Sequence, residues 1–135
     1  MSEWRTFSVA VRWRDLDPLG HVNSVVVLTL LEEGRNAYLS RVLGEGFGVD
    51  EYVVAHVEVD YRVEIPSGTQ FVESRQRVVA LGNSSVTFEE ELWTPSGVIA
   101  AAGRVVIVMW VPQRHRSRPL TTLERQAIAC EMALV

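Results

Sequence analysis

The chain has 135 residues, of which 47% are hydrophobic and 22% charged, a composition typical of globular proteins that excludes wholesale disorder. All 13 basic residues are arginines. The formal charge is nevertheless −4, which argues against general nucleic-acid binding. The single cysteine, Cys130, excludes an internal disulfide and a cysteine-based zinc cluster. We expect one cytoplasmic domain over residues 1–135, without a signal peptide or a membrane span.

The N-terminal segment alternates between apolar and polar residues. Every second position from Phe7 to Trp13 is apolar, and a period of two predicts a half-buried strand over residues 5–15. The alternation stops where Pro18 and Gly20 break the pattern, which indicates a loop.

A long apolar stretch follows, from Val25 to Leu43. Its valine-rich start favours a strand, but its length of about 20 residues favours a helix of about 30 Å. Asn23 or Ser24 can cap the start, and Gly44 follows the last apolar residue. A helix that is apolar over most of its circumference must be wrapped by other structure. Polar residues at helical spacing form a single stripe, made of Thr29, Glu33, Asn36 and Ser40.

The second half of the chain is dominated by strand patterns separated by turn signals. Gly82-Asn83 has the composition of a tight hairpin, and Thr121 with Glu124 forms a capping box that starts a C-terminal helix. We predict an α+β fold in which one antiparallel sheet of about five strands wraps a long central helix, with a short C-terminal helix added. The predicted strands cover 5–15, 51–65, 70–81, 85–93 and 98–111, and the apolar face of the last helix comprises Leu123, Ala127, Cys130 and Leu134.

The loop before the long helix concentrates chemically versatile side chains. Residues 15–24 contain two carboxylates, an imidazole and an amide, directly before a helix N-terminus with its free N–H groups and partial positive charge. A carbonyl oxygen docked there is polarised, and a neighbouring carboxylate can act as a general base or nucleophile. The alternative is a polar capping loop in which Asp17 or Asn23 only satisfies helix N–H groups. The residues alone leave both interpretations open.

A family resemblance favours the catalytic interpretation. The pattern D-x-D-x-x-G-H-V-N at residues 15–23, followed by E-x-x-R at 32–35, resembles hotdog-fold thioesterases of the 4-hydroxybenzoyl-CoA thioesterase type. The resemblance implies hydrolysis of an acyl-CoA or acyl-carrier-protein thioester in a pocket between two subunits. It makes Asp17 the catalytic carboxylate and the backbone N–H near Ser24 the group that polarises the thioester carbonyl. Coenzyme A is part of the substrate, and no separate cofactor or metal is implied.

The candidate catalytic residues all belong to the loop and the helix start. His21 is a candidate for orienting water or substrate, with a structural role as the equal alternative. The chain departs from the family pattern at Ser24, where relatives commonly carry a second asparagine, and at Val25–Val27, where a tyrosine is usual. These departures make the pocket mouth more apolar. The predicted catalytic set is Asp17, His21, Asn23 and Ser24.

Candidate binding residues lie farther along the chain. A flap over the acyl pocket is predicted at residues 44–48, with Phe47 as its apolar tip. His56 and Arg62 share a polar strand face, interpreted as a subunit contact or pocket rim, or alternatively as a solvated face. The arginines of residues 114–118 suit coenzyme A phosphates, and their alternative is a solvated loop. The predicted substrate-binding set is Val25, Phe47, His56, Arg62, Arg114, Arg116 and Arg118.

One further residue and one residue pair are interpreted as structural, and the assembly follows from the resemblance. Asp15 is expected to stabilise the loop, and Glu32 to form an ion pair with Arg35 along the helix. In the resembling family the strand at about 52–64 pairs with its twin, which predicts a homodimer, doubled to a homotetramer. Two alternatives to the thioesterase remain: a non-catalytic acyl-CoA-binding hotdog domain, and a hotdog hydratase or dehydratase.

Overall fold

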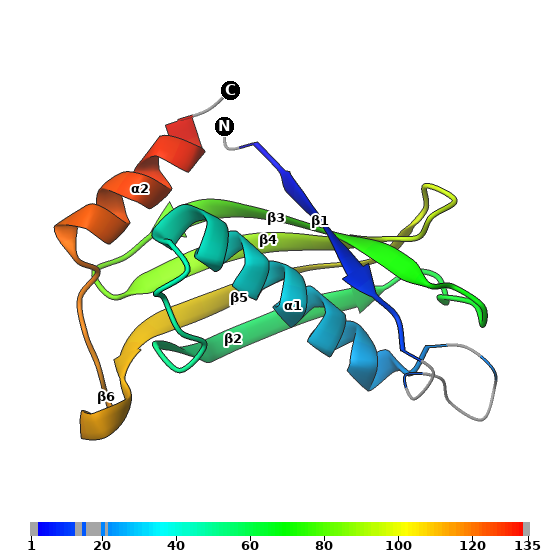
Figure 1. Ribbon diagram of the computed structural model, residues 1–135, viewed down its shortest axis with the longest axis horizontal. Coiled ribbons are helices and arrows are strands. Elements are labelled where there is room, and N and C mark those ends of the chain that lie inside the picture. Colours follow the sequence, from blue (N-terminus) through cyan, green and yellow to red (C-terminus); the bar gives the residue numbers. More distant parts are fainter. Residues whose placement is uncertain (1–2, 13–14, 16–19, 21, 134–135) are drawn as a thin grey trace.

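The computed structural model describes residues 3–12, 15, 20 and 22–133. One antiparallel sheet in the order β1-β3-β4-β5-β2 lies against a long helix, α1, and the short strand β6 pairs with β5 outside that order (Figure 1). The predicted α+β architecture is confirmed. Its elements are β1 (Arg5–Ala10), α1 (Ser24–Leu43), β2 (Tyr52–Tyr61), β3 (Phe71–Leu81), β4 (Ser85–Trp93), β5 (Ile99–Val111), β6 (Arg116–Ser117) and α2 (Thr122–Ala133).

Helix α1 begins and ends where its capping residues predict. Asn23 is the N-cap, and Gly44 follows Leu43 with a φ of 96°, a left-handed conformation that suits glycine. The buried side of α1 contacts the sheet with leucines and Tyr38, while its polar positions are more exposed. Burial of this apolar side overrides the strand propensity of the valine-rich start, because the helix gains its stability from packing.

The strand boundaries follow the sequence pattern closely at β3 and β4 and less closely elsewhere. Strand β1 ends at Ala10 rather than continuing to residue 15, because the chain turns where the Asp15 N–H donates to the Arg12 carbonyl. Strand β2 ends at Tyr61. Strand β5 is buried at alternate positions from Val105 to Met109, so within one chain one of its faces packs against the core there.

The core between α1 and the sheet consists of two apolar clusters with a polar layer between them. One cluster lies under the C-terminal half of α1, where Tyr38 packs edge-to-face against Phe88 with ring centroids 5.3 Å apart. The other lies under the N-terminal half around Leu30 and Leu31. The buried polar layer between the clusters comprises Arg35, Ser74, Gln76 and Glu90.

Arg35 forms a buried ion pair with the sheet and not with its own helix. Its guanidinium donates two hydrogen bonds to the carboxylate of Glu90 on β4, at 2.6 and 3.0 Å. The predicted pair between Glu32 and Arg35 is therefore wrong, and Glu32 is exposed. Burial raises the pKa of the Glu90 carboxyl, although the hydrogen bonds from Arg35 oppose this shift.

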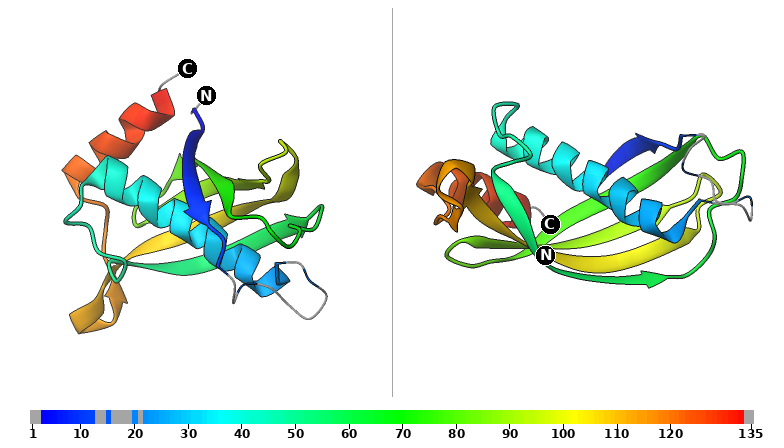
Figure 2. Two further views of the ribbon diagram at one scale, coloured as in Figure 1. Left: turned by 45° about the vertical axis from the view of Figure 1, so that its right-hand side comes forward. Right: turned by 90° about the horizontal axis from the view of Figure 1, so that it is seen from below.

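Helix α2 has the predicted start but a different buried face. Thr121 and Glu124 form the capping box, because each side chain accepts from the other's backbone N–H. The predicted apolar face is wrong: Leu123 is 78% exposed and Cys130 is exposed, whereas Ile128 is fully buried. Leu134 lies outside the described residues. The start of β1 and the end of α2 are neighbours (Figure 2), and the Arg5–Glu131 ion pair joins the two elements.

Strand β2 forms one edge of the sheet and is exposed along most of its length. It pairs with β5 on one side, and its residues after Tyr52 are exposed or half-buried. Apolar side chains stand exposed on it, including Val54 at 43%, Val57 at 44% and Tyr61 at 52%. A long apolar edge of this kind favours pairing with another chain.

Candidate functional site

A pocket lies at the N-terminus of α1, between the first helical turn and the end of β2. Its volume is about 270 Å³. The Tyr61 hydroxyl donates a 3.0 Å hydrogen bond to the Ser24 carbonyl and so joins β2 to the helix start. The residues that line the pocket are Val22, Ser24, Val27, Tyr61, Arg62, Val63 and Glu64.

The helix cap leaves one backbone donor available at this pocket. The Asn23 side-chain oxygen accepts from the Val25 N–H at 2.8 Å, and the Asn23 carbonyl accepts from Val26 and Val27. No residue that the structure describes accepts from the Ser24 N–H. This donor at the positive end of the helix dipole has the chemistry of an oxyanion-hole group. Asn23 thus has a capping role, one of the two alternatives that the sequence left open.

Asp15 stabilises the loop, as predicted. It is only 3% exposed, and its carboxylate accepts from the Arg12 N–H at 2.8 Å. Its carbonyl accepts from the Asn23 N–H at 3.0 Å, which ties the start of the loop to the helix cap. The other predicted catalytic residues of the loop, Asp17 and His21, lie outside the described residues.

The predicted binding residues near this end of the molecule divide into two groups. Arg62 lines the pocket, and Val25 is 69% exposed on the first turn of α1. His56 lies elsewhere: it pairs in register with Val106 on β5, and its ring contacts the Glu58 carboxylate at 2.9 Å. Within one chain His56 is therefore a residue of the outer sheet face and not of the pocket.

The predicted flap and arginine patch lie at the opposite end of α1. Phe47 stacks on Tyr52 with centroids 6.5 Å apart and packs against the core, so it is not the exposed tip of a flap. Residues 114–118 lie around β6, which Figure 1 shows at the end of the molecule away from the α1 N-terminus. A helix of 20 residues spans about 30 Å. Neither group converges with Ser24 in one chain.

Within the arginine patch, one side chain is already neutralised. Arg118 donates two hydrogen bonds to Glu124, at 2.7 and 2.9 Å, and this pairing lowers the pKa of the Glu124 carboxyl. Arg114 and Arg116 are exposed. Only these two arginines remain as candidate phosphate ligands in the patch.

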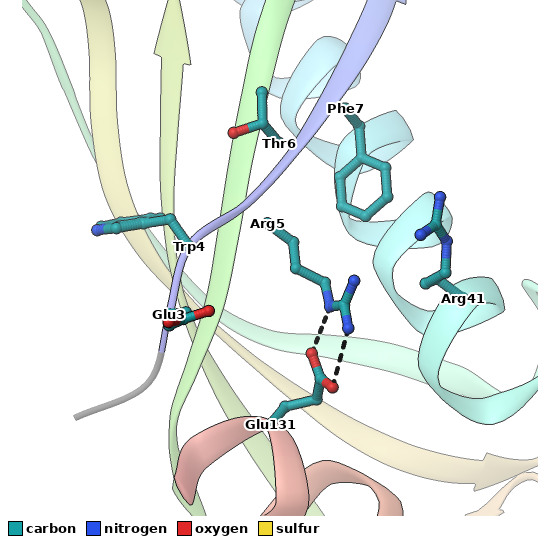
Figure 3. A pocket seen from close by; sticks show the side chains of 7 residues that line it. All are labelled: Glu3, Trp4, Arg5, Thr6, Phe7, Arg41 and Glu131. Atoms are coloured by element: carbon teal, nitrogen blue, oxygen red, sulfur yellow. Dashed lines mark hydrogen bonds and ion pairs between the residues drawn. The ribbon is translucent and has the colours of Figure 1, made fainter. Parts of the chain in front are cut away.

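A second pocket of about 300 Å³ lies between β1, the end of α1 and α2 (Figure 3). Its arginine Arg5 points to Glu131 and forms both of its hydrogen bonds there, so the charges neutralise each other. Arg41 also lines this pocket, but it belongs to the C-terminal end of α1, away from the predicted catalytic loop. The pocket at the α1 N-terminus is the better candidate site.

Two residues of the candidate site were not singled out by the sequence pattern. Tyr61 places a phenol beside the first turn of α1, in a chain whose helix lacks the tyrosine usual in the resembling family. Val63 forms the pocket wall just beyond β2. Both residues continue the apolar and polar alternation of the strand. Their position at the pocket becomes evident only from the contact between the end of β2 and the start of α1.

The comparisons with known proteins agree with this geometry. The family model of the thioesterase-like superfamily matches residues 11–123. The chain belongs to this superfamily. A search of curated proteins finds no match. The superfamily assignment and the architecture together confirm the predicted hotdog fold.

Similar solved structures cover nearly the whole chain. A Thermus thermophilus thioesterase, complexed with coenzyme A and Zn, is 37% identical, with a TM-score of 0.81 over 96% of this chain and 95% of that one. A predicted thioesterase from Bacillus stearothermophilus is 26% identical, with a TM-score of 0.84 and 96% of both chains covered. A Staphylococcus aureus protein in complex with CoA shares the fold at 13% identity, with a TM-score of 0.82, 97% of this chain and 85% of that one.

None of the described helices is long and apolar enough to cross a membrane. No group of three or more histidine, cysteine or acidic side chains in residues 3–12, 15, 20 and 22–133 has the arrangement of a metal site.

Proposed function

We propose that the protein hydrolyses an acyl-CoA or acyl-carrier-protein thioester at the N-terminus of α1. The observation that carries this proposal is the pocket beside Ser24, whose N–H has no acceptor among the described residues. Membership of the thioesterase-like superfamily supports it, as does the Thermus thermophilus thioesterase that binds coenzyme A.

In the proposed reaction the thioester carbonyl oxygen accepts from the Ser24 N–H, which stabilises the negative charge that develops there. Asp17 either removes a proton from water as it attacks the carbonyl carbon or attacks that carbon itself. The carbon–sulfur bond then breaks, the thiol leaves with a proton, and water supplies the oxygen of the free acid. His21 is the proposed group that orients the water or the substrate.

The proposed reaction follows the resemblance to the 4-hydroxybenzoyl-CoA thioesterase type, in which an aspartate precedes the central helix. The aromatic substrate of that type does not follow from this resemblance. The first helical turn carries Val25–Val27, and the pocket has walls of Val22, Val27 and Val63 beside the single phenol of Tyr61.

The direct test is a thiol-release assay on acyl-CoAs of short, long and aromatic type, with an acyl-carrier-protein panel beside it. Turnover of at least one of these substrates is expected. Its absence from all of them would overturn the hydrolase proposal. The alternative is an acyl-CoA-binding domain without activity, which Ser24 and Val25–Val27 favour because they depart from the enzyme pattern. Tight binding without turnover would identify it.

We expect the protein to be a homodimer joined along β2, as the exposed edge and its apolar side chains suggest. Light scattering at micromolar concentration should give twice the mass of one chain, or four times if the dimer doubles to a tetramer. Val57→Arg, at a residue that is 44% exposed, should shift the mass towards the monomer. Leu123→Arg, on α2, is the matched control and should leave the mass unchanged. A monomeric parent protein would contradict the prediction.

Such a dimer leaves a role open for the arginine patch. Arg114 and Arg116 are exposed and unlike Arg118 not paired with Glu124. Because they lie at the end of the molecule away from the α1 N-terminus (Figure 1), we propose them as ligands for coenzyme A phosphates only where an assembly brings them to another subunit's pocket.

A further inference from the structure

A large groove runs beside the candidate site, between the turn after β2 and the turn that joins β4 to β5. Its volume is about 870 Å³, within the range of small-molecule sites. Three apolar side chains line it and are exposed: Val63 at 47%, Phe71 at 54% and Val98 at 45%. We call it the turn groove, and its other walls include Pro66 and Pro95.

The turn groove continues the pocket at the α1 N-terminus. Val63 and Glu64 line both cavities, so the two meet at these residues. The junction is held by backbone bonds, since the Val63 N–H donates to the Ala100 carbonyl and the Val22 N–H donates to the Ile65 carbonyl at 2.9 Å. Both turns lie at the end of the sheet where α1 begins (Figure 1).

Both turns are internally hydrogen-bonded, so the groove exists before any ligand arrives. The Gly97 N–H donates to the Thr94 carbonyl at 2.9 Å, and the Thr94 hydroxyl contacts Ser96. The Thr69 N–H donates to the Pro66 carbonyl, and Gly68 adopts the positive φ that this turn needs. A preformed groove binds a flexible chain without first ordering the protein.

The lining selects the chemistry of the occupant. Of the described residues that line the turn groove, only Glu64 is charged. An alkyl chain gains free energy for each methylene that it buries against Val63, Phe71 and Val98. The uncharged polar side chains of the lining are Ser67, Thr69, Gln70, Thr94 and Ser96. The pocket of about 270 Å³ beside Ser24 is small for a whole acyl group, and the groove extends it.

We propose that the turn groove binds the alkyl chain of a long-chain acyl thioester whose carbonyl lies at Ser24. This inference rests on the proposed function and adds the substrate class: a long aliphatic acyl group. The thioester end lies in the small pocket, and the chain passes Val63 and continues along Phe71 and Val98.

The test compares two groove variants on two chain lengths. Phe71→Asp and Val98→Asp each place a charge in the groove at an exposed position, so the fold should be kept. We expect kcat/KM for dodecanoyl-CoA to fall at least about tenfold, which corresponds to the free energy of burying roughly two methylenes. The kcat/KM for acetyl-CoA should change little. Leu123→Asp, 78% exposed on α2, is the matched control. Equal effects on both substrates, or none, would overturn the groove assignment.

A binding measurement separates the groove from the proposed function. S-dodecyl-CoA, a thioether that cannot be hydrolysed, should bind the parent protein at least about tenfold more tightly than S-methyl-CoA. Phe71→Asp should remove that difference. If the parent hydrolyses nothing but shows this preference, the hydrolase proposal fails and the groove stands. If both thioethers bind equally, or if Val98→Asp instead changes the mass in light scattering, the groove is not a chain site.

Discussion

Asp17→Asn is expected to lower kcat at least about 100-fold, because the amide can neither accept a proton from water nor attack the thioester carbon. The substitution keeps the size of the side chain and much of its hydrogen bonding. KM should change little, since the proposed contacts to the acyl chain and to the Ser24 N–H lie elsewhere. Steady-state thiol release on the best substrate of the acyl-CoA panel measures both constants.

Asp15→Asn is the matched control two residues away. The Asp15 carboxylate is buried and accepts from the Arg12 N–H, a bond that the asparagine oxygen can keep. We therefore expect a modest loss of stability and a much smaller loss of kcat. Near-normal turnover by a folded Asp17→Asn variant would mean that the motif has been misread, and His21 would be the next candidate. A larger effect at Asp15 than at Asp17 would mean the same.

The helix and most of the strands were predictable because their signals are local. Length and caps at Asn23 and Gly44 identified α1 against the strand propensity of its valines, since a largely apolar segment of 20 residues between two cap signals exceeds an ordinary strand. The turn at Gly82-Asn83 likewise placed β3 and β4 at their observed ends. Such signals can be recognised without knowledge of the tertiary contacts.

The errors concern partners, which are decided by tertiary packing. Spacing alone pairs Arg35 with Glu32, but Arg35 points towards the sheet, where Glu90 is its partner. For α2, the apolar stripe suggested Leu123 as a buried position, whereas the helix rotates to bury Ile128. In each case the spacing along the helix suggested one partner or one buried face. The packing of a distant element decided the actual one.

The candidate site was predictable in its chemistry and less so in its extent. The motif located the helix start and the donor near Ser24, and the structure adds the pocket beside it. It moves Phe47 and the arginine patch to the other end of α1. The turn groove is formed by two turns that are far apart in sequence, so only the sheet register brings them together.

The buried ion pair between the two core clusters should carry the largest effect on stability. The Arg35 side chain is 4% exposed and the Glu90 side chain 0%. Glu90→Ala leaves the guanidinium buried without its counter-charge, and we expect a loss of about 3–5 kcal/mol in the free energy of unfolding. Urea denaturation monitored by circular dichroism measures this loss through the midpoint.

The double variant Arg35→Met/Glu90→Met separates the pair's net contribution from the cost of breaking it. Two ions removed from water lose hydration free energy, and their mutual attraction only partly compensates for it. Apolar side chains of similar volume should therefore recover most of the stability that Glu90→Ala loses. Stability within about 1 kcal/mol of the parent would show that the pair specifies how α1 sits on the sheet more than it stabilises the fold. A double variant as unstable as Glu90→Ala would instead show that the ion pair itself stabilises the protein, and that the polar layer with Ser74 and Gln76 depends on it.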